Sequence, residues 1–438
     1  MNHQVVITGI GAVTGFGYGA QALWEGLLEG RTSLRRISAF DPSGFRCQVA
    51  SEVRDFNVRD HVPKHYRKAT KVMARDIELA VGAAKAAIED AGIITRGVDD
   101  TTPPTFAANR VGCQIGAGLI AAEVPELAAA LATAAPGGHF SYDDWGTTGM
   151  TNLTPLWLLK YLPNMLACHV TIIHDARGPS NTITCAEASA LLSIGESRSV
   201  IERGDADLCF SGGAESKINL MGVLRMDKLG RLAPVHAAAD APLDTTTIVR
   251  PFATDARGSI LGEAGSIVML ESLDSARARG ARIYAEAAGF GAGHAPWSDD
   301  PGVRAEGLAA AIENALEDAS LSPRDIDAIV PRATACPAID QEEIAALRAV
   351  FGSHLAAVPL ITVTPNIGDT VASSGGVGVC VAALALHHQM LPARINAGKC
   401  PADIQSHAAP ASDARLRHVL VCTGALGGQN AALILRSA

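Results

Sequence analysis

The chain has 438 residues, of which 48% are hydrophobic, 18% charged and 4% aromatic. This length fits two domains of about 200 residues or one large fold built from two similar halves. The hydrophobic content excludes a chain that is disordered over most of its length. The formal net charge of −9, without a Lys/Arg-rich block, makes nucleic acid an unfavourable partner.

The nine cysteines are scattered singly, and no two of them have the CxxC spacing. We therefore expect neither a disulfide framework nor a metal site, and nothing in the sequence indicates a cofactor. The longest apolar stretch, Val377–Leu386, is about half of a membrane span. Because Met1, Asn2 and His3 lead directly into an apolar run without a basic segment, no signal peptide is indicated. We expect a soluble, cytoplasmic protein.

Short β-branched runs alternate with Ala- and Leu-rich segments of helical spacing along the whole chain. The first half has expected strands at Val5–Gly9, Val111–Ile115, Leu208–Ser211 and Ser266–Leu270, and a further strand that ends with Ile183–Cys185. Its expected helices are Ala69–Ala91 and Ala188–Glu202. The second half has expected strands at Ile283–Ala288, Ala328–Pro331, Ile361–Val363, Val419–Cys422 and Ala431–Leu435, and expected helices at Gly307–Ala319, Asp340–Val350 and Val377–His388.

This alternation predicts an α/β fold in which helices cover the sheets. The two halves, 1–260 and 261–438, have the same βαβ-rich rhythm. Since no Ser/Gly/Pro-rich linker separates them, we expect the halves to pack as one body.

Five motifs occur in a fixed order along the chain: VVITGIGAVTGFG from Val5, Gly178–Pro179–Ser180, IERGDADLCFSGGAES from Ile201, Arg250–Pro251–Phe252 followed by LGEAG, and ALGGQNAALIL from Ala425. Together they resemble the β-ketoacyl-acyl-carrier-protein synthases, the condensing enzymes (ketosynthases) of the thiolase fold. The resemblance covers nearly the whole chain. It implies a thiolase-like layered α/β sandwich, a dimer, and an acyl carrier protein as partner.

The resemblance also implies a catalytic site of four groups. A Cys thiolate at a helix N-terminus takes the acyl chain, two His stabilise the enolate that attacks it, and a Lys supports one His. Counting from the motifs places the nucleophile on Glu187, the two His on Arg332 and Asp369, and the Lys on Thr364. All four reactive residues are therefore replaced in this chain.

Glu187, Arg332 and Asp369 have two interpretations. A carboxylate at a helix N-terminus is favourable by roughly 0.3–1 kcal/mol without any function, so the three residues could have changed independently, with at least one of them solvated. Taken together, however, the replacements put one cation between two anions. A guanidinium bridged by two carboxylates satisfies its donors, so we hypothesise an ionic cluster that fills the former active site.

Cys185 and Leu426 each have a functional and a structural interpretation. Cys185 lies two residues before Glu187 and could be a displaced nucleophile. However, an inert cysteine in a strand is commoner, and no His lies in a motif that would bring it to Cys185.

Leu426 takes the place where these synthases often carry a Phe that gates the acyl pocket. It is either a wall of that pocket or a simple packing residue.

Four basic residues, Lys64, Arg67, Lys68 and Lys71, precede and begin the expected helix Ala69–Ala91. An ordinary solvated basic face is one interpretation. In the synthases that the chain resembles, basic residues at the places of the first three dock the acidic carrier protein. Such a patch on an otherwise acidic body would attract an acidic partner.

The sequence thus favours a non-condensing, chain-length-factor-like subunit of a type II fatty-acid or polyketide synthase. It would pair with an active ketosynthase and an acyl carrier protein. One alternative is an active β-ketoacyl-acyl-carrier-protein synthase or malonyl decarboxylase that uses Cys185 or Glu187. Another is a homodimeric protein that binds an acyl carrier or a lipid.

Overall fold

The computed structural model describes residues 4–237 and 243–438. Its main element is a 10-stranded sheet in the order β11-β14-β15-β10-β1-β9-β7-β5-β6, with β2 paired to β1. The strands of this sheet are β1 (Val5–Thr14), β2 (Gly17–Tyr18), β5 (Val111–Ala117), β6 (Ser180–Ile183), β7 (Leu208–Glu215), β9 (Ala264–Ser272), β10 (Ala285–His294), β11 (Ala328–Val330), β14 (His418–Gly424) and β15 (Gln429–Arg436). Two small sheets are formed by β3 (Arg35–Arg36), β4 (Val49–Ser51) and β8 (Leu261–Gly262), and by β12 (Met390–Leu391) and β13 (Ser412–Asp413).

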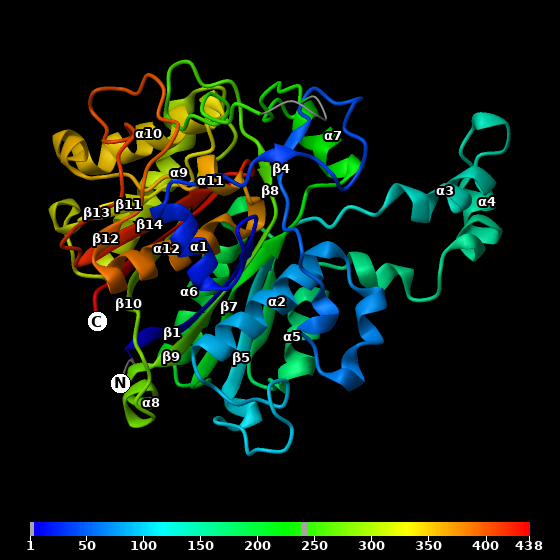
Figure 1. Cartoon of the computed structure of the whole chain (residues 1–438), viewed down its shortest axis with the longest axis horizontal. Coiled ribbons are helices and arrows are strands. Elements are labelled where there is room, and N and C mark those ends of the chain that lie inside the picture. Colours follow the sequence, from blue (N-terminus) through cyan, green and yellow to red (C-terminus); the bar gives the residue numbers. More distant parts are fainter. Residues whose placement is uncertain (1–3, 238–242) are drawn as a thin grey trace.

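Helices cover the main sheet on both faces (Figure 1). They are α1 (Ala20–Leu28), α2 (Arg75–Asp90), α3 (Val124–Thr133), α4 (Tyr142–Thr147), α5 (Met165–His174), α6 (Ser189–Glu202), α7 (Leu220–Lys228), α8 (Leu273–Ala278), α9 (Pro301–Asp318), α10 (Pro337–Phe351), α11 (Thr364–Ile367) and α12 (Ser374–His388). α6 and α12 contact each other and the sheet, while α2 packs on β1 and β9, and α9 packs on β10 and β15.

Strand β9 shows how the two layers of helices are separated. Successive residues of a strand point to opposite faces of its sheet. Gly265 lies against the backbone of Leu79 in α2, where an added Cβ would come within 2.3 Å of the Leu79 carbonyl oxygen. The next residue, Ser266, hydrogen-bonds Ser373 at the start of α12 with 2.7 Å between the hydroxyl oxygens. α2 and α12 therefore cover opposite faces of the sheet.

α12 is the central helix of the protein. The helical segment Val371–His388 is long and apolar enough to cross a membrane, but 83% of it is buried inside the protein. It contacts strands from both parts of the chain, among them β1 and β7 before residue 260 and β9 and β14 after it. This burial is that of a core helix.

The predicted alternation of strands and helices is present, and two expected elements differ. Ile361–Val363 is not a strand: isolated bridges join the preceding residues Pro359 and Leu360 to Gln405 and Ile329. The chain then enters α11 at Thr364, where Pro365 favours a helix start. The helix expected from Ala69 begins at Arg75, after a short 3-10 helix, η3 (Ala69–Val72).

One segment leaves the body of the protein. Residues 119–162, between β5 and α5, carry α3 and α4, which project well away from the sheet and its covering helices (Figure 1). We refer to residues 119–162 as the arm. The remaining elements converge on the beginning of α6, where the candidate site lies.

Candidate functional site

Glu187 lies at the turn between the edge strand β6 and helix α6. The preceding residue, Ala186, has a φ of 46°, in the left-handed region that is unfavourable for a residue with a side chain. The turn is held by Ser189, whose hydroxyl accepts from the backbone N–H of Cys185 at 2.8 Å and donates to the Ala186 carbonyl at 2.6 Å. The turn directs the Glu187 side chain into the protein, where the residue is 1% exposed.

Arg332 lies on the loop after β11, and two buried carboxylates of α10 hold this loop. The Glu343 carboxylate accepts the backbone N–H groups of Arg332 and Ala333 at 2.7 and 2.9 Å. The Asp340 carboxylate accepts the N–H groups of Thr334 and Ala335. Burial raises the pKa of Glu343 to about 7 and that of Asp340 to about 6, although the hydrogen bonds from these N–H groups lower both pKa values.

Asp369 is fixed mainly through its backbone. Its N–H donates to the Ile260 carbonyl at 2.7 Å, and its carbonyl accepts from the Gly262 N–H at 2.9 Å. One carboxylate oxygen accepts the Val371 N–H at 3.0 Å, which leaves the other oxygen to face Arg332.

The structure brings Glu187, Arg332 and Asp369 together. Arg332 Nη2 lies 2.9 Å from Glu187 Oε1 and 3.4 Å from Asp369 Oδ2. Arg332 Nη1 donates to the carbonyl of Gly424 at 2.8 Å. All three side chains are buried, with 4% of the Arg332 side chain exposed. The guanidinium is therefore shared between the two carboxylates, as the hypothesis of an ionic cluster requires.

A fourth residue, Arg231, completes the cluster. Its Nη1 donates to the same oxygen of Glu187, and its side chain is 7% exposed. Burial alone would raise the pKa of Glu187, but the charges of Arg332 and Arg231 lower it to about 2. Glu187 and Asp369 in turn hold the pKa of Arg332 above its ordinary value despite burial. Two cations and two anions thus neutralise one another, and we name these four residues the ionic cluster.

The sequence analysis missed Arg231 because it lies in no motif that the resemblance carries. The segment after α7 has one arginine in an apolar context, Leu229–Gly230–Arg231–Leu232, and such an arginine requires a buried partner. Only the folded chain places it beside Glu187.

Thr364 and Cys185 lie next to the ionic cluster without joining it. The hydroxyl of Thr364 donates to the Arg332 carbonyl at 3.1 Å, so Thr364 supports the loop and carries no charge. Burial raises the pKa of the Cys185 thiol, which disfavours the thiolate needed for nucleophilic attack. Cys185 therefore lacks the lowered pKa of an activated thiol.

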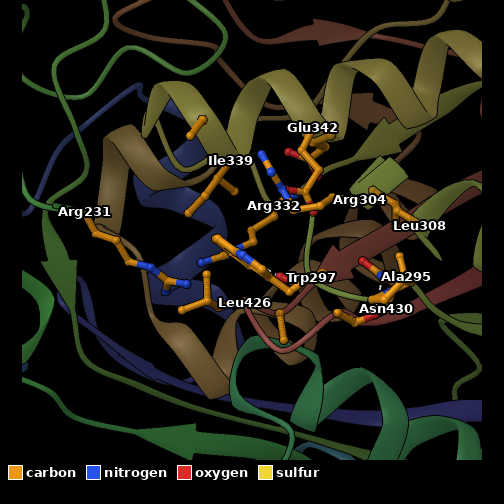
Figure 2. A pocket seen from close by; sticks show the side chains of 16 residues that line it. Arg231, Ala295, Trp297, Arg304, Leu308, Arg332, Ile339, Glu342, Leu426 and Asn430 are labelled. Carbon is orange, nitrogen blue, oxygen red and sulfur yellow. Dashed lines mark hydrogen bonds and ion pairs between the residues drawn. The ribbon is translucent and has the colours of Figure 1, made fainter. Parts of the chain in front are cut away.

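Three cavities lie beside the ionic cluster, and the smallest, of about 30 Å³, is lined by Arg332, Thr364 and Asp369 among others. The other two share part of their lining. The first, of about 100 Å³, is lined by Arg231, Arg332, Trp297 and Leu426 among others, and Figure 2 shows Arg231 and Leu426 side by side at one end of it. The second, of about 450 Å³, has Glu187, Arg231 and Leu426 in its lining, together with apolar residues such as Leu119 and Met226. Arg231 and Leu426 thus separate the two spaces. Within the described residues, neither lining includes a histidine.

The four basic residues of the predicted patch lie on the surface. Lys64, Arg67, Lys68 and Lys71 are all exposed, on and around the 3-10 helices η2 (Lys64–Tyr66) and η3. Among the residues that the structure describes, none of the four has an ion-pair partner. η3 contacts a further 3-10 helix, η7 (Trp157–Tyr161), so the patch borders the base of the arm.

Fold and site define the class of protein: a thiolase-like condensing-enzyme scaffold whose turn before α6 carries a carboxylate in an ion-pair cluster. The Beta-ketoacyl synthase N-terminal domain matches residues 2–276, and the Beta-ketoacyl synthase C-terminal domain matches residues 284–398. The chain belongs to the β-ketoacyl synthase family, which confirms the predicted resemblance and fold class.

Similar proteins cover the whole chain. The 3-oxoacyl-[acyl-carrier-protein] synthase 2 of Staphylococcus aureus (strain N315) is 29% identical over 440 residues, 99% of this chain and 98% of the relative. The synthase of the same name from Coxiella burnetii is 29% identical over 437 residues, with the same coverage. Among solved structures, the ishigamide ketosynthase/chain length factor has a TM-score of 0.83 and 27% identity, with both chains fully covered. A beta-ketoacyl synthase from Burkholderia phymatum STM815, at 24% identity and a TM-score of 0.81 over both full chains, shares the fold.

We predict that Arg332→Ala lowers the free energy of unfolding by about 3–5 kcal/mol, because it leaves Asp369 as a buried charge without its cation. Glu187 still has Arg231 as an ion-pair partner in this variant, so the lost stability reflects one unpaired carboxylate, that of Asp369. Urea unfolding measures it. As a control, Arg348→Ala breaks a pair with Asp403 in which both side chains are about half exposed, and we expect a loss of less than about 1 kcal/mol. Equal losses in the two variants would contradict the cluster.

The ionisation of Glu187 gives a second prediction. Because its folded-state pKa, about 2, lies below its ordinary value, its ionisation stabilises the fold above about pH 4.5, and this stabilisation is lost as the pH falls toward 2. Between pH 5.5 and 3, the wild type should lose about 2 kcal/mol more than Glu187→Gln. Urea unfolding at several pH values measures the difference. Parallel pH profiles would show that the Glu187 carboxylate is not stabilised in its charged form.

Proposed function

We propose that the chain is a non-condensing, chain-length-factor-like subunit of a type II fatty-acid or polyketide synthase. It would pair in the cytoplasm with an active ketosynthase that is served by an acyl carrier protein. The observation that carries the proposal is the ionic cluster, three of whose members, Glu187, Arg332 and Asp369, stand where the resemblance puts the Cys and the two His of the family.

The chemistry of the ionic cluster does not fit condensation. Condensation needs a thiolate to hold the acyl chain and imidazoles to stabilise an enolate. A Glu187 carboxylate paired with two guanidinium groups is a poor base, and with a pKa of about 2 it carries no proton to donate near neutral pH. Arg332 and Asp369 are occupied by each other and by Glu187, so neither is free to bind a substrate carbonyl.

The larger cavity supports a role in holding a chain. Its volume of about 450 Å³ and its apolar residues, among them Leu119, Met226 and Leu229, suit an aliphatic or polyketide segment. Leu426 also lines this cavity. A partner that delivers a growing chain into this space would have the length of its product limited by the cavity.

Pairing with a second ketosynthase fold is supported by the free edge of the main sheet. β6 is the last strand, and in the described part of the chain β5 is its only strand partner. Ser180 and Asn181 in β6 are exposed. An unpaired edge of this kind accepts a strand from another chain. The ishigamide ketosynthase/chain length factor, at 27% identity, is a similar protein whose name joins the two kinds of subunit.

The experiment co-expresses this chain with each Cys-His-His ketosynthase of its source genome and supplies acyl-carrier thioester and malonyl-carrier. We expect one ketosynthase to co-elute with this chain, and intact-mass measurement to find acyl groups on that ketosynthase alone. Cys185→Ala should leave the product unchanged. An acyl adduct on Cys185, or release of carbon dioxide by this chain alone, would instead establish the active-enzyme alternative. Acyl carrier or lipid bound by a stable homodimer would establish the binding-protein alternative.

Carrier docking is tested on the basic patch. Replacing Lys64, Arg67 and Lys68 together with Glu should weaken carrier binding by about tenfold or more at low salt, because the carrier is acidic. The effect should shrink as the salt concentration rises. Arg277→Glu, Arg324→Glu and Arg415→Glu together, at three exposed arginines elsewhere, change the net charge by the same amount and provide the control. Binding by surface plasmon resonance that is equal in both variants would exclude the patch.

A further inference from the structure

The larger cavity beside the ionic cluster has cations in an otherwise apolar lining. Lys217, Arg225 and Arg231 line this space of about 450 Å³ together with Glu187 and Glu215, while most of the other lining residues are apolar. A charge that faces an apolar space is unfavourable unless an opposite charge or a hydrogen bond compensates it. The groups that compensate these cations therefore decide what kind of molecule the cavity takes.

The guanidinium of Arg231 uses only part of its hydrogen-bonding capacity. Its Nη1 donates to Glu187, and in the part of the chain that the structure describes neither Nε nor Nη2 has a hydrogen-bond partner. A guanidinium carries five N–H donors. The side chain is 7% exposed and lies at the wall of the cavity, where Figure 2 shows it beside Leu426. Arg231 is thus a buried cation with unused donors at this wall.

Lys217 and Arg225 also have donors to spare. Nζ of Lys217 pairs with Glu215 and donates to the Leu119 carbonyl at 2.7 Å. Because an ammonium group has three N–H donors, one is left at the cavity wall. Arg225, in the last turn of α7, is exposed, and no described carboxylate forms an ion pair with it. Both side chains can therefore attract a further anion.

The two carboxylates of the lining do not cancel this attraction. Glu187 lies between the two arginines of the ionic cluster. Glu215 pairs with Lys217 and accepts the Ala372 N–H at 2.8 Å. The ionic cluster, Glu215, Lys217 and Arg225 together contain four cations and three anions. The excess of positive charge favours an occupant with one anionic group.

We propose that the cavity takes an aliphatic chain that ends in a carboxylate, bound by Arg231 and attracted by Lys217 and Arg225. The chain-holding role rests on the proposed function, to which the inference adds the class of chain. A planar guanidinium matches a carboxylate with two parallel N–H donors, so Arg231 is the principal contact. The rest of the chain lies against the apolar part of the lining. An uncharged end leaves these donors without an acceptor, so the cavity discriminates against it.

The experiment titrates the purified full chain with two probes of the same carbon chain, the monomethyl and the dimethyl ester of decanedioic acid. Only the monoester has a carboxylate at neutral pH. We expect isothermal titration calorimetry to show that the monoester binds at least about tenfold more tightly, because its carboxylate pairs with Arg231. Equal affinity for the two esters would overturn the proposal. Inorganic phosphate that binds as tightly as the monoester would also overturn it, since charge alone would then be recognised.

Two variants locate the binding. Arg225→Gln removes a cation of the lining at an exposed residue, so the fold should be retained and monoester binding should weaken about threefold or more. Lys228→Gln removes an exposed cation of the same helix that does not line the cavity, and it should bind like wild type. Equal affinities of these two variants would overturn the assignment to the cavity.

A third variant tests the guanidinium itself. Arg231→Lys keeps a cation beside Glu187 but loses the two parallel donors, so monoester binding should weaken by about tenfold while dimethyl ester binding stays the same. An unchanged affinity for the monoester would show that Arg231 does not hold the carboxylate.

The outcomes also separate this inference from the proposed function. The titration needs no partner, so its failure overturns the carboxylate site and leaves the pairing with a ketosynthase intact. Selective binding of the monoester by a chain that pairs with no ketosynthase overturns the proposed function instead. The carboxylate site then supports the alternative of a lipid-binding protein.

Discussion

The Arg332 guanidinium, shared between Glu187 and Asp369, is the interaction on which the site depends. In the low-dielectric interior, each of these charges would be costly alone, and only their mutual contact makes their burial tolerable. Each charge comes from a different segment: the turn before α6, the loop after β11 and the loop after α11. The cluster therefore joins both halves of the chain at the point where a condensing enzyme performs its chemistry.

The ionic cluster also lies between two of the cavities beside it. Arg231 and Leu426 lie in the lining of both cavities, with Glu187 facing the larger and Arg332 the smaller.

Sequence motifs predicted the fold and part of the site for identifiable physical reasons. Glycine-rich turns and buried strands keep fixed spacing, so counting from them placed Glu187, Arg332 and Asp369 at one point in space. The strand expected at Ile361–Val363 was wrong, because the chain here has no continuous partner strand. It forms isolated bridges at Pro359 and Leu360 before Pro365 begins a helix. Arg231 was missed because its partner is 44 residues away and no local pattern joins them.

By itself, the sequence determined the α/β architecture and the family, and it predicted Glu187, Arg332 and Asp369 as members of one site. These features depend on residue types and on local spacing, which are readable along the chain. The tertiary structure alone decided that two arginines, not one, neutralise Glu187, that Arg231 and Leu426 line two neighbouring cavities, and that the arm stands away from the body. Those features depend on contacts between distant segments, and the energy of a buried charge or an exposed apolar helix is set by what surrounds it in space.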